Sequence, residues 1–172
     1  RALIVDEVQA NAQMMRAWLQ ALGMRVDVAS NGGEAFTLLG SAAHAGDPVR
    51  VAVVDYLLPG MDCEALARGV RADPALSRMG LVVATSAAQR GDAERFRSAG
   101  YDAYLTKPLR LETLLAALEV VLAREPSARV ADPILTRHLL NERRLSPTSV
   151  ARIRARAAAQ ARAFQRVLLA ED

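Results

Sequence analysis

The sequence predicts an α/β fold: a parallel sheet of five strands, wound doubly so that helices cover both of its faces. Short apolar runs alternate with amphipathic segments along residues 1–124, which is the order expected of repeated strand–helix units. Three of the apolar runs are almost uninterrupted, as is typical of parallel strands that are buried on both faces. Four of the five predicted strands end next to a polar side chain, which is where ligands bind in such sheets.

Turn-forming residues separate the predicted elements. Strands are expected where short apolar runs end at such residues, namely at 2–5, 24–29, 49–54, 81–84 and 101–106. Helices are expected where apolar residues recur every three or four positions, namely at 11–22, 34–39, 63–71, 89–99 and 109–124. Gly23 and Gly100 end two of these helices, and Pro59-Gly60 breaks the loop after the third strand. The last helix presents a leucine stripe that we expect to be buried, formed by Leu111, Leu114, Leu115, Leu118 and Leu122.

The composition fits one domain with some additional chain, and it excludes several classes of protein. The chain has 172 residues, of which 52% are hydrophobic. No apolar run approaches the ~18 residues of a membrane span, so no membrane contact is expected. A single cysteine, Cys63, excludes a disulfide within the chain and favours the reducing cytoplasm. The sequence has no initiating Met and opens within an apolar run, so we expect a piece of a longer cytoplasmic protein.

Charge is distributed unevenly along the chain. The formal net charge is +3, yet residues 143–170 hold seven arginines and no acidic residue. The other 15 basic and 19 acidic residues form an acidic body, which therefore carries a basic tail. Because the body is acidic and no DNA-binding motif follows it, no DNA partner is expected. Among the 22 basic residues only Lys107 is a lysine, which indicates a position that needs a compact ammonium group.

Polar side chains gather where four of the predicted strands end. They are Asp6, Glu7, Asp55, Thr85 and Lys107. Carboxylates at one edge would repel each other, and Mg²⁺ bound by Asp6, Glu7 and Asp55 would resolve this repulsion. One carboxylate could then act as a nucleophile toward phosphorus, with Lys107 and Thr85 contacting the phosphoryl oxygens. The alternative is that Asp6 and Asp55 only cap their loops and that Lys107 is a surface residue.

Residues 1–124 resemble the receiver domain of two-component response regulators. The resemblance rests on the order and spacing of four segments: Leu3-Ile4-Val5-Asp6-Glu7, Asp55-Tyr56-Leu57-Leu58-Pro59-Gly60-Met61-Asp62, Thr85-Ser86 and Tyr104-Leu105-Thr106-Lys107-Pro108. It implies a flavodoxin-like sheet with the strand order 2-1-3-4-5. It also implies a phosphoprotein of a signal-transduction phosphorelay.

The resemblance also implies a role for each residue at the strand ends. Asp55 would be the phosphoacceptor, and Thr85 and Lys107 would be the other catalytic residues. Thr85 and Tyr104 would form the switch pair, and the Lys107–Pro108 bond would be cis. The implied magnesium ligands are Asp6, Glu7, Asp55 and the carbonyl oxygen of Leu57.

The rest of the chain resembles the junction between tandem receivers in hybrid sensor histidine kinases. Helices are expected at residues 134–144 and 150–165. Residues 166–172 repeat the pattern of residues 1–7, and the alternative is coincidence in a short window. The expected organisation is a receiver at 1–124, a basic, partly helical linker at 125–165, and the first strand of a truncated second receiver at 166–172. The implied partners are the second receiver and the catalytic and dimerisation domains of a histidine kinase, which the module would control by phosphorylation or docking.

A second surface is predicted around the fourth helix. Arg90, Glu94 and Arg97 fall at helical spacing, and Tyr104 and Arg110 are expected beside them. The favoured interpretation is a solvent-exposed face with an internal Arg–Glu pair. The alternative is a ligand-binding face of Arg90, Arg97, Tyr104 and Arg110 that takes a cyclic dinucleotide such as c-di-GMP. In that alternative the chain is a pseudo-receiver that senses a ligand and inhibits the kinase.

Overall fold

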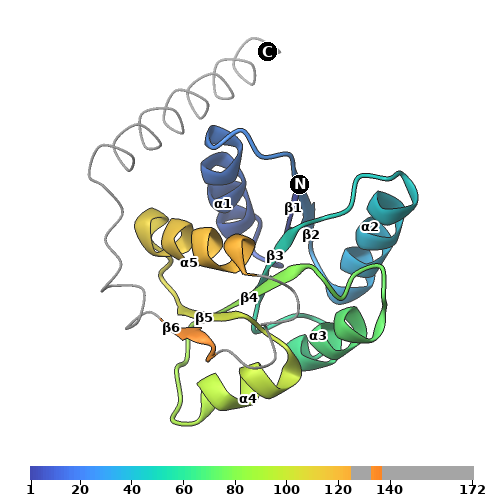
Figure 1. The fold of residues 1–172 in the computed structure, drawn as a ribbon. Helices are drawn as coiled ribbons and strands as arrows, with labels where there is room; N and C mark the ends of the chain where they lie inside the picture. The colour runs from blue at the N-terminus through green and yellow to red at the C-terminus, as the bar shows by residue number, and fades with distance from the viewer. Residues whose placement is uncertain (125–132, 137–172) are drawn as a thin grey trace.

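The computed structural model describes residues 1–124 and 133–136, and these residues form a six-stranded sheet in the order β2-β1-β3-β4-β5-β6 (Figure 1). The strands are β1 (Ala2–Val5), β2 (Val26–Ala29), β3 (Val51–Asp55), β4 (Gly80–Thr85), β5 (Ala103–Thr106) and β6 (Leu135–Thr136). All neighbouring strands pair in parallel. The predicted parallel sheet and its order 2-1-3-4-5 are therefore confirmed, and β6 extends the sheet beyond the prediction.

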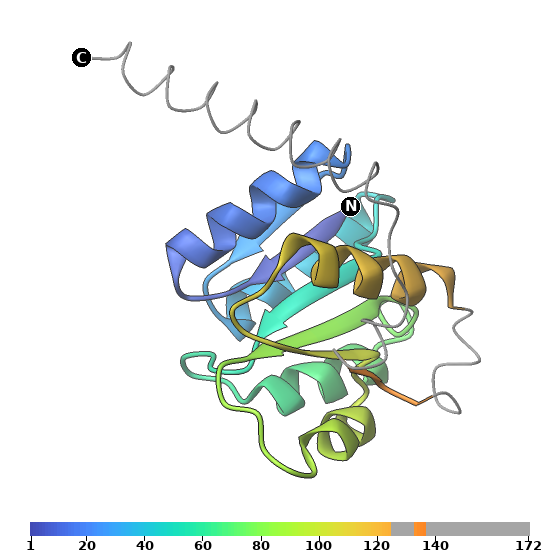
Figure 2. The ribbon, with the colours of Figure 1, turned by 90° about the vertical axis from the view of Figure 1, so that its left-hand side faces the viewer.

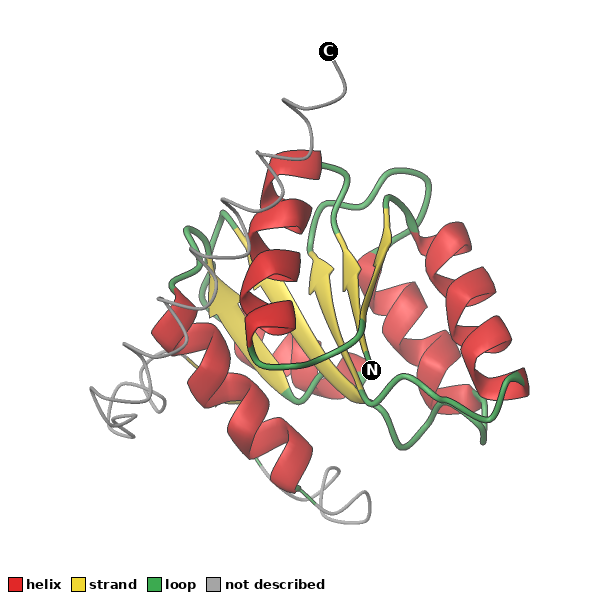
Figure 3. Cartoon of the chain, turned by 90° about the horizontal axis from the view of Figure 1, so that it is seen from above, coloured by secondary structure: helices red, strands yellow, loops and turns green. Residues whose placement is uncertain are grey.

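Helices cover both faces of this sheet, as the prediction of a doubly wound fold requires. They are α1 (Gln9–Ala21), α2 (Gly32–His44), α3 (Cys63–Ala72), α4 (Asp92–Ala99) and α5 (Leu111–Ala123). The pair α1 and α5 covers one face, while α2, α3 and α4 cover the other (Figures 1 and 2). Figure 3 looks onto the face that α1 and α5 cover. None of the helices in the described ranges has the length and hydrophobicity that crossing a membrane requires.

Two apolar layers, one on each side of the sheet, hold the helices in place. Leu3 and Val54 belong to the layer that includes the buried residues of α2, α3 and α4. Ile4 and Val53 belong to the layer that includes α1 and α5. Successive side chains of a strand point to opposite faces, so a strand covered on both faces is apolar at every position. This geometry explains the uninterrupted apolar runs of the central strands.

The start of α2 is set by two hydrogen bonds that both involve Glu34. The side-chain oxygen of Asn31 accepts from the backbone N–H of Glu34 at 2.9 Å, and the Glu34 carboxylate accepts from the N–H of Ser30 at 2.7 Å. Asn31 thereby caps an N–H group that has no partner within the helix, and Glu34 ties the residue before the cap to the first turn. The helix is longer than the predicted 34–39, because its second half still buries Ala42 in the core.

The fourth helix begins later than the predicted residue 89. Gly91 takes a left-handed conformation with φ +94°, and the Asp92 carboxylate accepts from the backbone N–H of Gln89 at 2.7 Å. These two features hold the chain in a turn until Asp92. Arg90 therefore lies in the loop before α4, and the predicted helical spacing that linked it to Arg97 is wrong.

The predicted helix at residues 134–144 is wrong where the chain is described, because Leu135–Thr136 forms β6. Ile134 and Leu135 are adjacent and both buried, each in a different apolar layer. A strand can place neighbouring side chains on opposite faces, whereas a helix cannot. The remainder of that helix, the helix at 150–165 and the strand at 166–172 lie outside the described residues.

Candidate functional site

The carboxyl ends of four strands bring the predicted polar residues to one edge of the sheet. Asp6 follows β1, Asp55 is the last residue of β3, Thr85 is the last residue of β4, and Lys107 follows β5. These strands are direct neighbours in the order β1-β3-β4-β5. Parallel strands end at the same edge, so residues far apart in sequence converge there.

Lys107 joins the two aspartates at the centre of this edge. Its ammonium nitrogen lies 2.7 Å from Oδ2 of Asp55 and 3.0 Å from Oδ2 of Asp6. Asp6 is 2% exposed and Asp55 is 7% exposed, so both carboxylates are almost fully removed from water. Burial of Lys107 disfavours its charge, but the hydrogen bonds to Asp55 and Asp6 outweigh burial and raise the pKa of the ammonium group. Lys107 is thus part of a buried charge cluster and not a surface residue.

Backbone hydrogen bonds fix the positions of the same side chains. Oδ1 of Asp6 accepts from the N–H of Val8 at 2.9 Å, and Oδ1 of Asp55 accepts from the N–H of Leu57 at 3.4 Å. The N–H of Lys107 donates to the carbonyl oxygen of Thr85 at 2.7 Å. The aspartates therefore do cap their loops, as one interpretation of the sequence proposed, and they also share one cation.

Thr85 is buried beside the cluster, and its hydroxyl group is occupied by the following loop. Its Oγ1 accepts from the N–H of Ala87 at 3.2 Å and lies 3.4 Å from the Ala87 carbonyl oxygen. Thr85 is 1% exposed. A new hydrogen-bond acceptor attached to Asp55 would therefore compete with Ala87 for the Thr85 hydroxyl.

The aspartate pair is suited in part to a magnesium ion. Mg²⁺ prefers oxygen ligands and usually keeps several water molecules. Asp6 and Asp55 offer carboxylates from adjacent strands, but Glu7 is exposed. Within the described ranges, no three His, Cys, Asp or Glu side chains lie close enough together to hold a metal ion. The two aspartates therefore fit a cation whose other ligands come mainly from backbone or water, and Leu57, the predicted carbonyl ligand, is 62% exposed.

A cavity of ≈ 450 Å³ opens next to this cluster. It is lined by Asp6, Asn11, Met14, Met15, Ser86, Lys107, Pro108 and Leu109. The Lys107–Pro108 peptide bond is cis, as the sequence resemblance implies. Asp6 and Lys107 thus belong both to the charge cluster and to the wall of an open space beside it.

Tyr104 is buried and does not form part of an exposed arginine face. It is 8% exposed, and its ring stacks on Phe96 with 5.3 Å between the ring centroids. Its hydroxyl donates to Oδ2 of Asp92 at 3.4 Å. Burial, followed by the nearby Asp92 carboxylate, raises the pKa of Tyr104.

The three predicted arginines of that face lie on different elements. Arg90 is exposed in the loop before α4, and Arg110 is exposed at the residue before α5. Arg97 is on α4 and donates to both carboxylate oxygens of Glu94, at 2.7 and 3.0 Å. The Arg–Glu pair of the favoured interpretation is therefore present.

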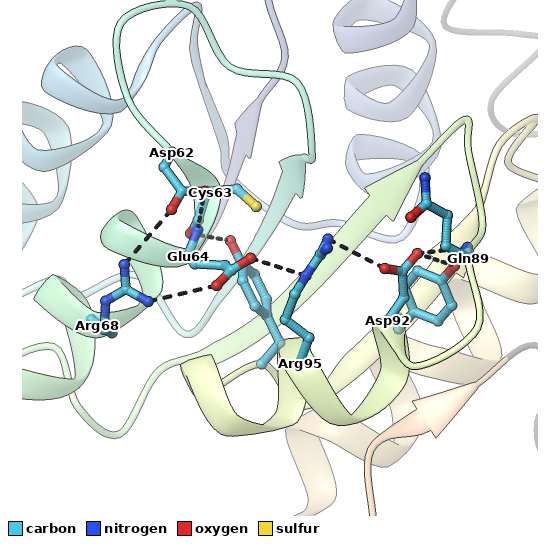
Figure 4. A network of polar contacts seen from close by, with 9 residues as sticks. Asp62, Cys63, Glu64, Arg68, Gln89, Asp92 and Arg95 are labelled. Carbon is cyan, nitrogen blue, oxygen red and sulfur yellow. Dashed lines mark hydrogen bonds and ion pairs between the residues drawn. The ribbon is translucent and has the colours of Figure 1, made fainter.

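A polar network between α3 and α4 was missed by the sequence analysis (Figure 4). Arg95 binds Glu64 of α3 at 3.0 Å and Asp92 at 3.3 Å, and its guanidinium group lies 5.4 Å from the ring centroid of Tyr56. Asp92 is 4% exposed and also accepts from the hydroxyl of Tyr104. The i,i+3 spacing of Asp92 and Arg95 was a signal in the sequence, but the contact with Glu64 requires the fold.

Cys63 lies beside this network and has no reactive character. The residue is fully buried at the start of α3, and its backbone carbonyl accepts from the Tyr101 hydroxyl at 2.8 Å. Burial is the main cause that raises the pKa of its thiol to about 12. A thiol with such a pKa carries almost no thiolate at neutral pH and is not a nucleophile.

Comparison with known proteins gives a consistent result. The family model of the response regulator receiver domain matches residues 2–119. The chain is 36% identical over 143 residues to the virulence sensor protein BvgS of Bordetella pertussis, a match that covers 77% of this chain and 11% of that protein. It is 30% identical over 109 residues to the response regulator PleD of Caulobacter vibrioides, covering 63% of this chain and 23% of that protein. The chain thus spans only a small part of these curated relatives.

Solved structures show the same fold. A putative response regulator from Chloroflexus aurantiacus has a TM-score of 0.64 and 28% identity, and the match covers 72% of this chain and 97% of that chain. The chemotaxis response regulator CheY4 of Vibrio cholerae has a TM-score of 0.63 and 26% identity, covering 70% and 96%. With the aspartates, the threonine and the lysine at one sheet edge, these matches show that the chain belongs to the response regulator receiver domain family of two-component signalling.

Proposed function

We propose that Asp55 accepts a phosphoryl group in a magnesium-dependent reaction and that the domain thereby transmits a signal within a larger sensor protein. The observation that carries this proposal is the position of Asp55. Its carboxylate is buried at the centre of the sheet edge and shares one lysine with Asp6, and both Lys107 and Asp6 line a cavity. A buried carboxylate that shares one ammonium group with a second carboxylate, in a cluster next to a cavity that a phosphodonor could enter, has the features of a reactive group.

The chemistry follows from these positions. A carboxylate oxygen of Asp55 attacks the phosphorus of a phosphohistidine, a P–O bond forms, and the P–N bond to the imidazole breaks with its electron pair staying on the imidazole. The Lys107 ammonium neutralises a phosphoryl oxygen, and the Thr85 hydroxyl donates to another once it leaves Ala87. Mg²⁺, when bound by Asp6 and Asp55, supplies further charge neutralisation. Glu7 and the Leu57 carbonyl remain predicted ligands.

The proposed donor is a histidine kinase of the same or a partner protein. The chain matches 11% of a virulence sensor protein, which supports a receiver embedded in a longer sensor. A second receiver after residue 165 and control of the kinase by docking remain proposals, because the residues concerned lie outside the described ranges.

Acetyl phosphate, a small phosphodonor, tests the proposal on the full chain. With Mg²⁺, the wild type should show a shifted band on a phosphate-affinity gel, and chelation of Mg²⁺ or the substitution Asp55→Asn should remove it. The matched control is Asp62→Asn, an exposed acid at the first turn of α3 whose capping role asparagine preserves. A wild type that stays unlabelled by acetyl phosphate and by an active histidine kinase contradicts the proposal and favours the pseudo-receiver.

The ligand-sensing alternative keeps its own test. No contact in the described residues favours it, because the Tyr104 ring is buried and the Arg97 guanidinium is occupied by Glu94. Titration calorimetry with c-di-GMP on the wild type and on Arg90→Ala decides it. Heat that the arginine substitution removes would establish a nucleotide site, and no heat would exclude one.

A further inference from the structure

The edge strand of the receiver sheet is covered by the chain's own downstream segment. Residues 133–136, called here the edge segment, include β6, which runs along the outer side of β5 (Figure 1). The backbone N–H of Leu135 donates to the carbonyl oxygen of Asp102 at 3.0 Å. The register places Leu135 opposite Ala103 and Thr136 opposite Tyr104. An uncovered edge strand would offer unpaired backbone groups to other chains.

Two apolar side chains anchor this segment on opposite faces of the sheet. Ile134 is 6% exposed and lies in the apolar layer that contains Phe96 and Tyr104. Leu135 is 7% exposed and lies in the layer that contains residues of α5. The carbonyl oxygen of Pro133 accepts from the Arg124 guanidinium at 3.0 Å, which ties the segment to the end of α5. The edge segment is therefore docked through backbone, apolar and polar contacts.

The docking is built on few contacts compared with the rest of the sheet. Only two residue pairs join β6 to β5, whereas four join β1 to each of its neighbours. Burial of two aliphatic side chains favours docking, and the ordering of four backbone residues opposes it with a free energy of similar size. The docked and undocked states are therefore close enough in free energy for a binding event to shift their populations.

Tyr104 lies at the point where the edge segment meets the receiver core. It is opposite Thr136 on the sheet and shares an apolar layer with Ile134. The Tyr104 hydroxyl binds Asp92. Lys107, three residues after Tyr104 in the sequence, binds Asp55. Removing the edge segment would uncover the side of β5 next to the Tyr104 ring. The buried position of Tyr104 and the docked position of the segment thus support each other.

We propose that residues 133–136 form a detachable sixth strand that holds Tyr104 in its buried position, so that undocking of the segment and release of the Tyr104 side chain occur together. The coupling is reciprocal, because each state of one element changes the stability of the other by the same factor. A partner strand can pair with β5 only after it displaces this segment. None of these steps requires phosphorylation, so the proposal stands independently of the proposed function.

The test uses the full 172-residue chain with the paired substitutions Ile134→Ser and Leu135→Ser. Amide hydrogen exchange of β5 should accelerate on the order of tenfold or more, because the covering strand no longer protects its edge. Fluorine NMR of 3-fluorotyrosine, assigned with Tyr104→Phe, should show the Tyr104 resonance becoming sensitive to solvent. The control is Leu22→Ser, which changes an exposed apolar residue at the end of α1 and should alter neither measurement.

Each outcome decides the proposal. Unchanged β5 exchange in a variant that light scattering shows to be monomeric would overturn it, as would an unchanged Tyr104 resonance beside accelerated exchange. A protected β5 edge in a dimeric variant would support it, because a second copy would have replaced the segment. If the paired substitution prevents folding, Ile134→Ala replaces it, and the reciprocal variant Tyr104→Ala should accelerate exchange at the N–H of Leu135, which donates to Asp102. Slow exchange there in Tyr104→Ala would contradict the coupling.

Discussion

The two ends of the sheet each contain a buried aspartate bound to a basic residue, and the two pairs differ in how their hydrogen bonds are used. At the amino ends, Asp102 binds Arg71 at 3.0 Å and accepts from the N–H of Leu81 at 2.8 Å. Arg71 also donates to the carbonyl oxygen of Met79 at 2.6 Å. At the carboxyl ends, Lys107 serves two aspartates and faces a cavity.

This difference separates a structural ion pair from a reactive one. The guanidinium of Arg71 has five N–H donors, which bind backbone carbonyls as well as Asp102. Arg71 therefore connects the loop before β4 to the loop before β5. The ammonium of Lys107 carries one charge between two carboxylates, so the cluster keeps a net negative charge. Burial of an acid is therefore no sign of reactivity by itself. A shortage of positive charge beside an open space is the more informative feature.

The largest expected effect is a difference in stability between the two aspartates. Asp102→Ala removes the buried carboxylate that binds Arg71 and accepts from the N–H of Leu81, and loss of one member of a buried pair costs about 3–5 kcal/mol. Asp55→Ala leaves Lys107 paired with Asp6 and removes a like-charge contact, so the free energy of unfolding should change by less than about 1 kcal/mol. Urea denaturation followed by circular dichroism measures both values. Equal losses in the two variants would contradict the distinction.

A change in phosphorylation rate comes next and concerns Lys107 alone. Lys107→Arg keeps the charge, but a planar guanidinium group cannot place one compact donor between Asp6 and Asp55. We expect labelling by acetyl phosphate to slow about tenfold, which corresponds to about 1.4 kcal/mol of transition-state free energy. The free energy of unfolding should change less than this. Labelling at the wild-type rate would show that the geometry of Lys107 does not matter.

A smaller effect, on the free energy of unfolding, is expected at alkaline pH. The raised pKa of Lys107 means that the folded state holds this proton more tightly than the unfolded chain does. The resulting stabilisation is fully present below the ordinary lysine pKa of 10.5 and is lost as the pH rises through the higher pKa of the folded state. Urea denaturation at a series of pH values gives the free energies of unfolding of the wild type and of Lys107→Met. The difference between the two free energies should shrink as the pH rises above 10.5.

Comparing the variant with the wild type isolates Lys107 from other groups that titrate at alkaline pH. Burial also raises the pKa of Tyr101 and Tyr104, and both residues are present in both proteins. Their contributions cancel in the difference between the two proteins. A difference that grows with pH would mean that the ammonium group destabilises the fold.

The sequence predicted the sheet, its order and the convergence at its carboxyl edge, because these follow from local apolar patterns and from the geometry of parallel strands. It did not predict β6, since a segment with two adjacent apolar residues becomes a strand only where a free sheet edge accepts it. It also expected Tyr104 beside exposed arginines. The stacking of Tyr104 on Phe96 depends on how α4 packs, and no local pattern encodes that packing.

The start of α4 shows the same limit. Residues 89–99 contain a helical pattern, but Gly91 and the hydrogen bond from the N–H of Gln89 to Asp92 delay the helix. Short helices are decided by such single contacts, because little of their free energy comes from intrinsic propensity. The prediction of Arg90 and Arg97 on one helix face failed for this reason.

The smallest expected effect distinguishes the two arginines of α4. Arg95 contacts Glu64 of another helix and Asp92 of its own, although its side chain is 40% exposed. Arg97 pairs only within the exposed surface of α4, among the contacts described.

Arg95→Ala should lower the free energy of unfolding by about 0.2–1 kcal/mol, the range of partly exposed ion pairs. It should also raise amide exchange at the start of α4, since Asp92 loses a contact that helps to hold it beside Tyr104. Arg97→Ala is the matched control, with no resolvable change in stability or in exchange. Equal effects of the two substitutions would show that the contact between α3 and α4 adds nothing to an ordinary surface pair.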